Sequence, residues 1–131
     1  MPVKPPKILI IEDEKFISKA YQVGLTHEGF KTVAAYNGQE GLDMAKKEKP
    51  DLILLDIIMP VMDGLTMLKE LRKQDWGKDM KVLVLTNSSD QAKTSESAHL
   101  NAIDFLLKSE WSIELLTKKL KGYYSYDEKT L

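Results

Sequence analysis

Residues 51–64 read DLILLDIIMPVMDG. Four consecutive apolar residues at 52–55 lead directly into Asp56, and a Met-Pro turn and Asp63-Gly64 follow. A short, continuous apolar run is typical of a strand that is buried on both faces, as in a parallel sheet. Asp63 is a suitable N-cap for a helix that contains Leu65, Leu68 and Leu71. The segment therefore predicts a strand, a loop that begins with a carboxylate, and a helix.

The same unit recurs along the chain. Apolar runs at 8–11, 32–35, 52–55, 82–85 and 103–107 predict five strands. Helical spacing lies between or after these runs. The first helix is indicated by Ile17, Ala20, Tyr21, Gly24 and Leu25 and closed by Gly29, the second runs from Asn37-Gly38 to Pro50, and the third from Leu65 to Leu71. The fourth, at about 90–101, has only Ala92, Ser95, Ala98 and Leu100 as its core stripe, and the fifth, with Ile113, Leu116 and Leu120, starts near Ser109 or Ser112. This alternation predicts an α/β fold, a doubly wound five-stranded parallel sheet with five helices. We expect an N-terminal arm at 1–6, one domain at 7–122, and a loose tail or the start of a linker at 123–131.

The composition excludes several classes of protein. The chain has 131 residues, 43% of them hydrophobic, with 19 Lys and Arg against 20 Asp and Glu, no cysteine and two histidines. This length suits one hydrophobic core without disulfides, and sulfur-ligated metal sites are excluded. No apolar run approaches the ~20 residues that span a bilayer, and no signal peptide is recognisable, so we expect a cytoplasmic protein. The near-neutral charge argues against direct binding of nucleic acid or membrane.

Chemically useful side chains follow four of the five strands. Glu12 and Asp13 follow the first, Asp56 the third, Thr86 the fourth and Lys108 the fifth. Ligands of doubly wound sheets bind outside the carboxyl ends of the strands, where these groups should meet. An all-oxygen set of carboxylates suits Mg²⁺. Asp56 could then act as a nucleophile that forms an acyl phosphate, with Lys108 and the metal neutralising the phosphoryl oxygens.

Together these motifs resemble the receiver domain of two-component response regulators. They are Ile11-Glu12-Asp13, the run from Leu54 to Pro60, Met62-Asp63-Gly64, Leu85-Thr86 and Phe105-Leu106-Leu107-Lys108, within roughly residues 5–122. The resemblance implies a flavodoxin-like strand order 2-1-3-4-5, for which a member of this family is a standard example. It also implies a signalling domain that catalyses only its own phosphorylation and dephosphorylation.

The roles of individual residues also follow from this resemblance. Asp56 would accept a phosphoryl group from a sensor histidine kinase or a phosphotransfer protein. Mg²⁺, with Mn²⁺ as an alternative, would be bound by Asp13, Asp56 and the backbone carbonyl of Ile58, and by Glu12 through water. Thr86 and Phe105 would be the switch pair that alters the surface of the fourth helix, fifth strand and fifth helix. That surface would then bind an unidentified downstream protein or output domain, or a second copy of the chain.

Three positions depart from the family pattern. Ser109 stands where proline with a cis peptide bond usually follows the lysine, which leaves two options: a reshaped trans loop or a strained cis bond, costing ~2.5–4 kcal/mol. Asn87 replaces a small residue after Thr86 and could crowd access to the phosphoryl group. Ile58 offers no polar group to orient a hydrolytic water, so we expect a long-lived phosphoryl group.

Other readings compete with this one. Taken singly, Glu12-Asp13 could be a solvated helix start, Asp56 a turn residue, Thr86 a half-buried strand residue, Lys108 a surface lysine and Phe105 core. A haloacid-dehalogenase-type phosphatase would also use a strand-end Asp and Mg²⁺, but it would want a second Asp at position 58. An FMN-binding domain would offer hydroxyls and N–H groups to a phosphate, whereas Glu12-Asp13-Glu14 would repel one. Four chemical coincidences at one sheet edge favour the receiver reading.

Overall fold

A single parallel sheet forms the centre of the molecule. The computed structural model describes residues 5–87 and 90–129. Its strands are β1 (Lys7–Ile11), β2 (Lys31–Ala35), β3 (Leu52–Leu55), β4 (Lys81–Thr86) and β5 (Asp104–Leu107). They are ordered β2-β1-β3-β4-β5, and every neighbouring pair is parallel. This confirms the predicted flavodoxin-like topology, and the carboxyl ends of all the strands meet at one edge.

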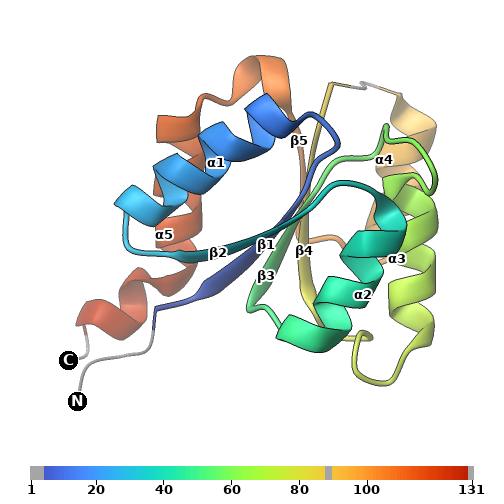
Figure 1. Cartoon of the computed structure of the whole chain (residues 1–131), viewed down its shortest axis with the longest axis horizontal. Coiled ribbons are helices and arrows are strands. Elements are labelled where there is room, and N and C mark those ends of the chain that lie inside the picture. Colours follow the sequence, from blue (N-terminus) through green and yellow to red (C-terminus); the bar gives the residue numbers. More distant parts are fainter. Residues whose placement is uncertain (1–4, 88–89, 130–131) are drawn as a thin grey trace.

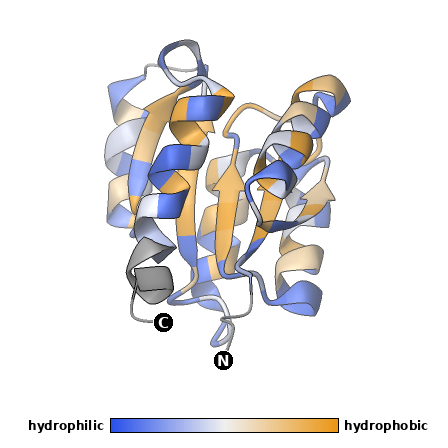
Figure 2. Ribbon diagram, turned by 90° about the vertical axis from the view of Figure 1, so that its left-hand side faces the viewer, coloured by the Kyte–Doolittle hydropathy of each residue, from blue (hydrophilic) through white to orange (hydrophobic). Residues whose placement is uncertain are grey.

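Helices cover both faces of the sheet (Figure 1). They are α1 (Lys15–His27), α2 (Gly38–Glu48), α3 (Gly64–Lys73), α4 (Gln91–His99) and α5 (Ile113–Lys129), and a single 3-10 turn, η1 (Lys108–Glu110), precedes α5. Helices α1 and α5 lie on one face, and α2, α3 and α4 lie on the other. Hydrophobic residues are concentrated in the strands and on the inner sides of the helices (Figure 2).

Alternate residues of the three central strands, β1, β3 and β4, pack into two separate cores. Leu9 and Ile11 of β1 belong to the core under α2 and α3, whereas Ile8 and Ile10 belong to the core under α1 and α5. Strands β3 and β4 alternate in the same way. Because both faces are buried, the strands read as continuous apolar runs, which is why they were recognisable in the sequence.

Local signals placed several helix ends correctly. The side chain of Asn37 accepts a hydrogen bond from the N–H of Glu40, and that of Asp63 accepts one from Thr66, so both are N-caps. The hydroxyl of Ser112 accepts a hydrogen bond from the N–H of Leu115 at the start of α5. Gly29 follows α1 with a φ of 95°, a conformation that favours glycine.

Three details of the sequence interpretation were wrong. In α1 the buried positions are Ser18, Tyr21 and Leu25, and Ala20 is exposed, because an alanine adds too little burial to orient a helix that carries larger side chains. In α4 only Ser97 is buried, and the expected stripe of Ala92, Ser95 and Ala98 is exposed. Helix α5 continues to Lys129, so residues 123–129 are helical, which differs from the loose tail that was one of the two expectations for this segment, the other being the start of a linker.

The third of these differences has a packing cause. The ring of Tyr124 lies edge-on to that of Phe30, with centroids 6.1 Å apart, and it packs on the core beneath α1 and α5.

Among residues 5–87 and 90–129, no helix is both long enough and apolar enough to cross a membrane.

Candidate functional site

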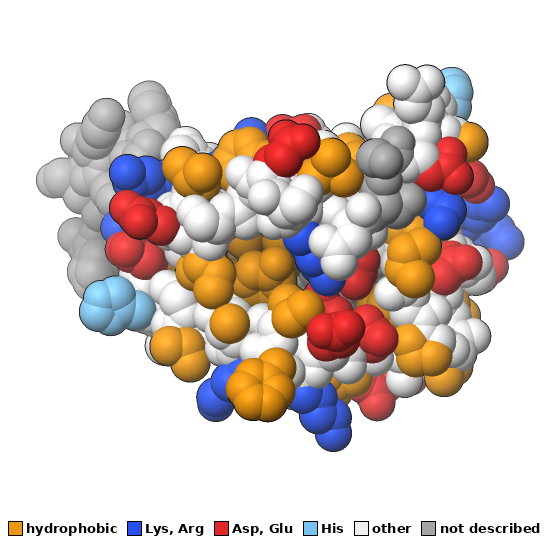
Figure 3. Space-filling view, turned by 90° about the horizontal axis from the view of Figure 1, so that it is seen from above, with side chains coloured by type: hydrophobic (Ala, Val, Ile, Leu, Met, Phe, Trp, Pro, Cys, Tyr) orange, Lys and Arg blue, Asp and Glu red, His pale blue; other side chains and the backbone are white. Residues whose placement is uncertain are grey.

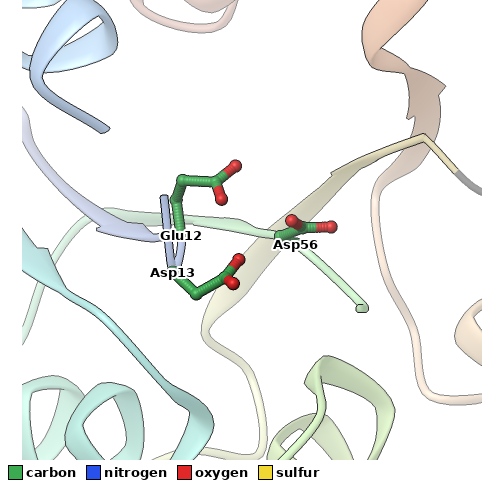
Figure 4. A group of neighbouring side chains, drawn as sticks. All are labelled: Glu12, Asp13 and Asp56. Atoms are coloured by element: carbon green, nitrogen blue, oxygen red, sulfur yellow. The ribbon is translucent and has the colours of Figure 1, made fainter. Parts of the chain in front are cut away.

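The register of the sheet gathers three carboxylates at one edge. Ile11 of β1 pairs with Leu55 of β3, so the residues that follow each of them, Glu12 and Asp56, leave neighbouring strands at the same level. The N–H of Asp56 donates to the carbonyl of Ile11 (3.0 Å) and continues the ladder by one residue. Figure 4 shows the carboxyl groups of Glu12, Asp13 and Asp56 gathered beyond these strand ends. One oxygen from each of the three lies within 4.8 Å of the others.

Lys108 joins this cluster from the edge of the sheet that β5 forms. It follows β5, whose Leu107 pairs with Thr86 at the end of β4. Its ammonium donates to Oδ2 of Asp56 at 3.0 Å and also to Oε1 of Glu12. The side chains of Glu12, Asp56 and Lys108 are only 3%, 8% and 10% exposed, so this is a desolvated ion-pair network. All peptide bonds of the described residues are trans, including the bond between Lys108 and Ser109. Lys108 therefore reaches the carboxylates from the 3-10 turn η1 although no proline follows it.

Burial and charge act in opposite directions on this network. Burial raises the pKa of the Glu12 carboxyl above its ordinary value, although hydrogen bonds from Lys108 and from the N–H of Glu14 partly counter it. Burial alone would lower the pKa of Lys108, but hydrogen bonds to Glu12 and Asp56 outweigh burial, so that pKa is raised. Lys108 is therefore a charged ammonium held between carboxylates.

The three carboxylates differ in how much of their binding capacity is already used. Both oxygens of Glu12 are occupied, Oε1 by Lys108 and Oε2 by the N–H of Glu14 (3.0 Å). Asp56 uses Oδ2 for Lys108, and from the described residues its Oδ1 accepts only a long hydrogen bond, donated by the N–H of Ile58 (3.4 Å). Asp13 makes no hydrogen bond or ion pair with any other residue in the part of the chain that the structure describes. This donor set fits a hard divalent cation, with Asp13 and Asp56 free to bind directly and Glu12 better suited to an indirect contact.

The loop after Asp56 is folded tightly against the site. A side chain at Gly64 would meet the backbone carbonyl of Asp56 at 2.1 Å, and one at Gly38 would meet that of Met62 at 2.4 Å. The N–H of Met62 donates to the carbonyl of Pro60 (2.7 Å), which closes a γ-turn with Val61 at its centre and a φ of 68°. This conformation is strained for a β-branched residue. Gly64 lies close to the backbone of Asp56 and Gly38 lies close to that of Met62, so the loop is held near both of its ends.

The expected switch residues lie on the α2, α3 and α4 side of the site. Thr86 is fully buried at the end of β4, and Phe105 is half-buried against the core on that side. Helix α4, which covers this region, is held by few contacts. Within the described part of the chain, it buries only Ser97, forms one ion pair to α3 (Lys69 Nζ to Glu96 Oε1, 2.5 Å) and is held at its C-terminal end by Arg72.

An open groove runs beside the carboxylates on the α1 and α5 side. It encloses about 540 Å³ and is lined by apolar residues of α1 and the start of α5, by Trp111, and by polar groups that include Asn87 and Lys108. Figure 3 shows a hollow with hydrophobic side chains on its floor, next to the acidic and basic side chains at the centre of this face. Phe16, at the N-terminal end of α1, lines the groove and is 94% exposed.

Sequence reasoning missed two residues that shape this region. Tyr21 was read only as part of the α1 core stripe, but it lines both the groove and a small cavity next to Glu12 and Asp56. Arg72 was not singled out, and its guanidinium donates to four backbone carbonyls: Leu100 (2.7 Å), Gly77 (2.9 Å), Met80 (2.7 Å) and Asn101 (3.2 Å). Neither residue belongs to a strand-end motif. The sequence signals for them are weak: Arg72 is an arginine within an otherwise amphipathic helix, and Tyr21 is a tyrosine within an apolar stripe.

Comparison with known proteins agrees with this geometry. The chain matches the family model described as response regulator receiver domain over residues 8–121. It is 34% identical over 125 residues to the probable C4-dicarboxylate response regulator DctR of Bacillus subtilis (strain 168), a match that covers 94% of this chain and 54% of that protein. The chain thus spans about half the length of that relative.

Solved structures resemble it over most of their length. The chemotaxis protein CheY4 of Vibrio cholerae has a TM-score of 0.83 and 30% identity, with 90% of this chain and 98% of that chain covered. The Mn²⁺-bound form of the response regulator Rcp1 has a TM-score of 0.79 and 26% identity, with 92% and 94% covered. The family model spans most of the chain, and the strand order and acidic cluster agree with it, so the chain belongs to the response regulator receiver domain family, whose members are signalling domains and not classical enzymes.

Proposed function

We propose that Asp56 accepts a phosphoryl group from the phosphohistidine of a sensor histidine kinase or a phosphotransfer protein, in a reaction that depends on Mg²⁺. The observation that carries this proposal is the Asp56 carboxylate itself. It is held at the end of β3 by the Lys108 ammonium at 3.0 Å, with oxygens of Glu12 and Asp13 within 4.8 Å. A nucleophile, a fixed cation and metal-ligating carboxylates are the parts that phosphoryl transfer requires.

The residues of the chain have distinct tasks in this reaction. One carboxylate oxygen of Asp56 forms a bond to phosphorus while the P–N bond of the phosphohistidine breaks. The electron pair of that bond returns to the imidazole, which takes up a proton. Lys108 neutralises charge on the equatorial oxygens, and its position is fixed by Glu12.

A divalent cation fits the same carboxylates. Asp13 and Asp56 would bind Mg²⁺, or Mn²⁺, directly, Glu12 would act through water, and the backbone carbonyl of Ile58 would complete the protein ligands. The cation supplies charge that screens the carboxylates from the incoming phosphoryl group. The metal-bound relative Rcp1 supports this assignment.

Two surfaces near the site are available to partner proteins. The apolar groove with Phe16 at its rim lies next to Asp56 and Lys108, which suits contact with the phosphodonor protein. The surface of α4, β5 and α5 lies along the edge of the sheet that β5 forms, next to Phe105, and we assign it to a downstream partner, an output domain or a second copy of the chain. A cytoplasmic location belongs to the same proposal, because the phosphodonor acts there.

Switching of α4 has its own support and its own test. A helix with one buried residue can shift at low cost when the Thr86 hydroxyl moves toward a phosphoryl group and Phe105 turns inward. Amide exchange is expected to be faster in residues 91–101 than in α3, and to change there when a phosphoryl mimic such as beryllofluoride is added. Uniform protection across this segment in both states would contradict the switch.

The phosphorylation site is tested by incubating the protein with Mg²⁺ and acetyl phosphate and measuring its intact mass. The mass is expected to rise by one phosphoryl group, stoichiometrically, and the rise is expected to vanish in Asp56→Asn. Asp75→Asn is a matched control because the Asp75 side chain is 99% exposed and outside the site, so it should label normally. Label that persists in Asp56→Asn would refute the assignment, and catalytic release of phosphate would favour an aspartate phosphatase instead.

A further inference from the structure

Tyr21 is a buried polar residue that the proposed reaction does not use. It lies on the inner face of α1 and is only 7% exposed. Its hydroxyl makes no hydrogen bond with any residue among 5–87 and 90–129. The hydroxyl is not sealed in the core, because Tyr21 borders the open groove, so a water molecule can reach it and serve as its hydrogen-bond partner.

Two cavities meet at Tyr21. One is the open groove that also contains Lys108. The other is a small pocket of about 10 Å³, walled by apolar strand residues and by Glu12 and Asp56. A cavity of this size holds about one water molecule, and a buried water requires two to four polar partners. Tyr21, Glu12 and Asp56 are the lining residues that carry such groups, a hydroxyl and two carboxylates.

The electrostatic environment of Tyr21 agrees with a donor role. Burial raises the pKa of its phenol, and the charges of Lys108, Glu12 and Asp56 all act on that group. The phenol is therefore protonated at neutral pH and can donate its O–H toward the carboxylates.

We propose that Tyr21 is a positioning residue of the phosphoacceptor site, whose hydroxyl holds one water in the cavity behind Glu12 and Asp56 and so fixes the Asp56 carboxylate for attack. This inference rests on the function proposed above. The water ties α1 to the ends of β1 and β3, and Lys108 restrains the same carboxylates from the other side. Without the water, the Asp56 carboxylate loses one of its restraints although Lys108 still bonds it, so its orientation is less firmly fixed and fewer encounters with a donor are productive.

Tyr21→Phe tests the hydroxyl alone, because it keeps the ring. Phosphorylation by acetyl phosphate with saturating Mg²⁺ is followed by intact mass at several donor concentrations. We expect the maximal rate to fall about tenfold, the donor concentration at half-maximal rate to stay unchanged, and the melting temperature to stay close to that of the wild type. Tyr36→Phe is the control for loss of a tyrosine hydroxyl, since Tyr36 follows β2, is half-buried and lies outside both cavities, and it should react at the wild-type rate.

A wild-type maximal rate in Tyr21→Phe would overturn the proposal, and so would a loss of rate that only parallels a loss of stability. A crystal structure supplies the second measurement: an ordered water within hydrogen-bonding distance of the Tyr21 hydroxyl and a carboxylate supports the proposal, whereas a dry cavity overturns it. Failure of the proposed function itself looks different. In that case the wild-type protein is not labelled, or Asp56→Asn still is.

Discussion

Replacement of Lys108 by methionine would leave two buried carboxylates without their cation. Methionine preserves most of the length and the apolar stem of the lysine, so the change removes charge with little loss of packing. The Lys108 ammonium lies 3.0 Å from Asp56 and also bonds Glu12, and all three side chains are at most 10% exposed. Removing one partner from such a buried network is expected to lower the free energy of unfolding by about 3–5 kcal/mol.

The geometry supports this magnitude. With an effective dielectric constant of about 20, a pair of unit charges at 3.0 Å attracts by about 5 kcal/mol, and two carboxylate oxygens within 4.8 Å repel by about 3 kcal/mol or more. Desolvation of the lysine offsets part of the attraction. Glu12→Gln added to Lys108→Met is therefore expected to recover about 1–3 kcal/mol, because it removes one of the two unpaired charges.

Urea unfolding followed by circular dichroism measures these differences, with EDTA and then with saturating Mg²⁺. The cost of Lys108→Met should be smaller with Mg²⁺, because the cation replaces the ammonium as a counter-charge. Lys118→Met is the control: that side chain is 72% exposed, and its loss should cost less than about 0.5 kcal/mol. A Lys108→Met protein within about 1 kcal/mol of the wild type in EDTA, or no recovery from Glu12→Gln, would refute the reasoning.

Four further perturbations have defined outcomes. Arg72→Met should lower the free energy of unfolding by about 2–4 kcal/mol in urea titrations, since it leaves four carbonyls without their donor; a loss below about 1 kcal/mol would contradict this role. Val61→Asn should raise stability by about 0.5–1 kcal/mol, because asparagine tolerates the positive φ better than valine; a lower melting temperature would argue against strain at this turn. Burial raises the pKa of Tyr124 to about 12 from 10.0, so the unfolded chain ionises first and stability should fall as the pH rises from 10 toward 12. Tyr124→Phe should make that fall smaller and, by removing a buried hydroxyl that has no hydrogen-bond partner among the described residues, raise stability at neutral pH by about 1 kcal/mol. Ile58→Asn should shorten the lifetime of the phosphoryl group, measured by its loss from intact mass, because the 54% exposed isoleucine cannot orient a hydrolytic water; an unchanged lifetime would remove the basis for this expectation.

Local sequence signals predicted the elements because each depends on neighbouring residues only. The continuous apolar runs marked strands buried on both faces, and Asn37 and Asp63 marked helix starts by capping chemistry. Prediction failed where local signals are weak. Helix α4 lacks large apolar residues, so its orientation depends on Arg72, the Lys69–Glu96 pair and the buried Ser97, and none of these follows from its own periodicity.

The sequence by itself determined the alternation of strands and helices and which chemical groups stand at the strand ends, since both are written in short stretches of chain. Only the tertiary structure decided how those groups meet. Lys108 bonds Glu12, 96 positions away, and Asp56, 52 positions away, because the strand order and register bring the ends of β1, β3 and β5 to one edge. The tertiary structure also decided which carboxylate oxygens remain free and that Tyr21 lies behind them. Side-chain pairing over such separations depends on packing of the whole sheet, and no local pattern carries that information.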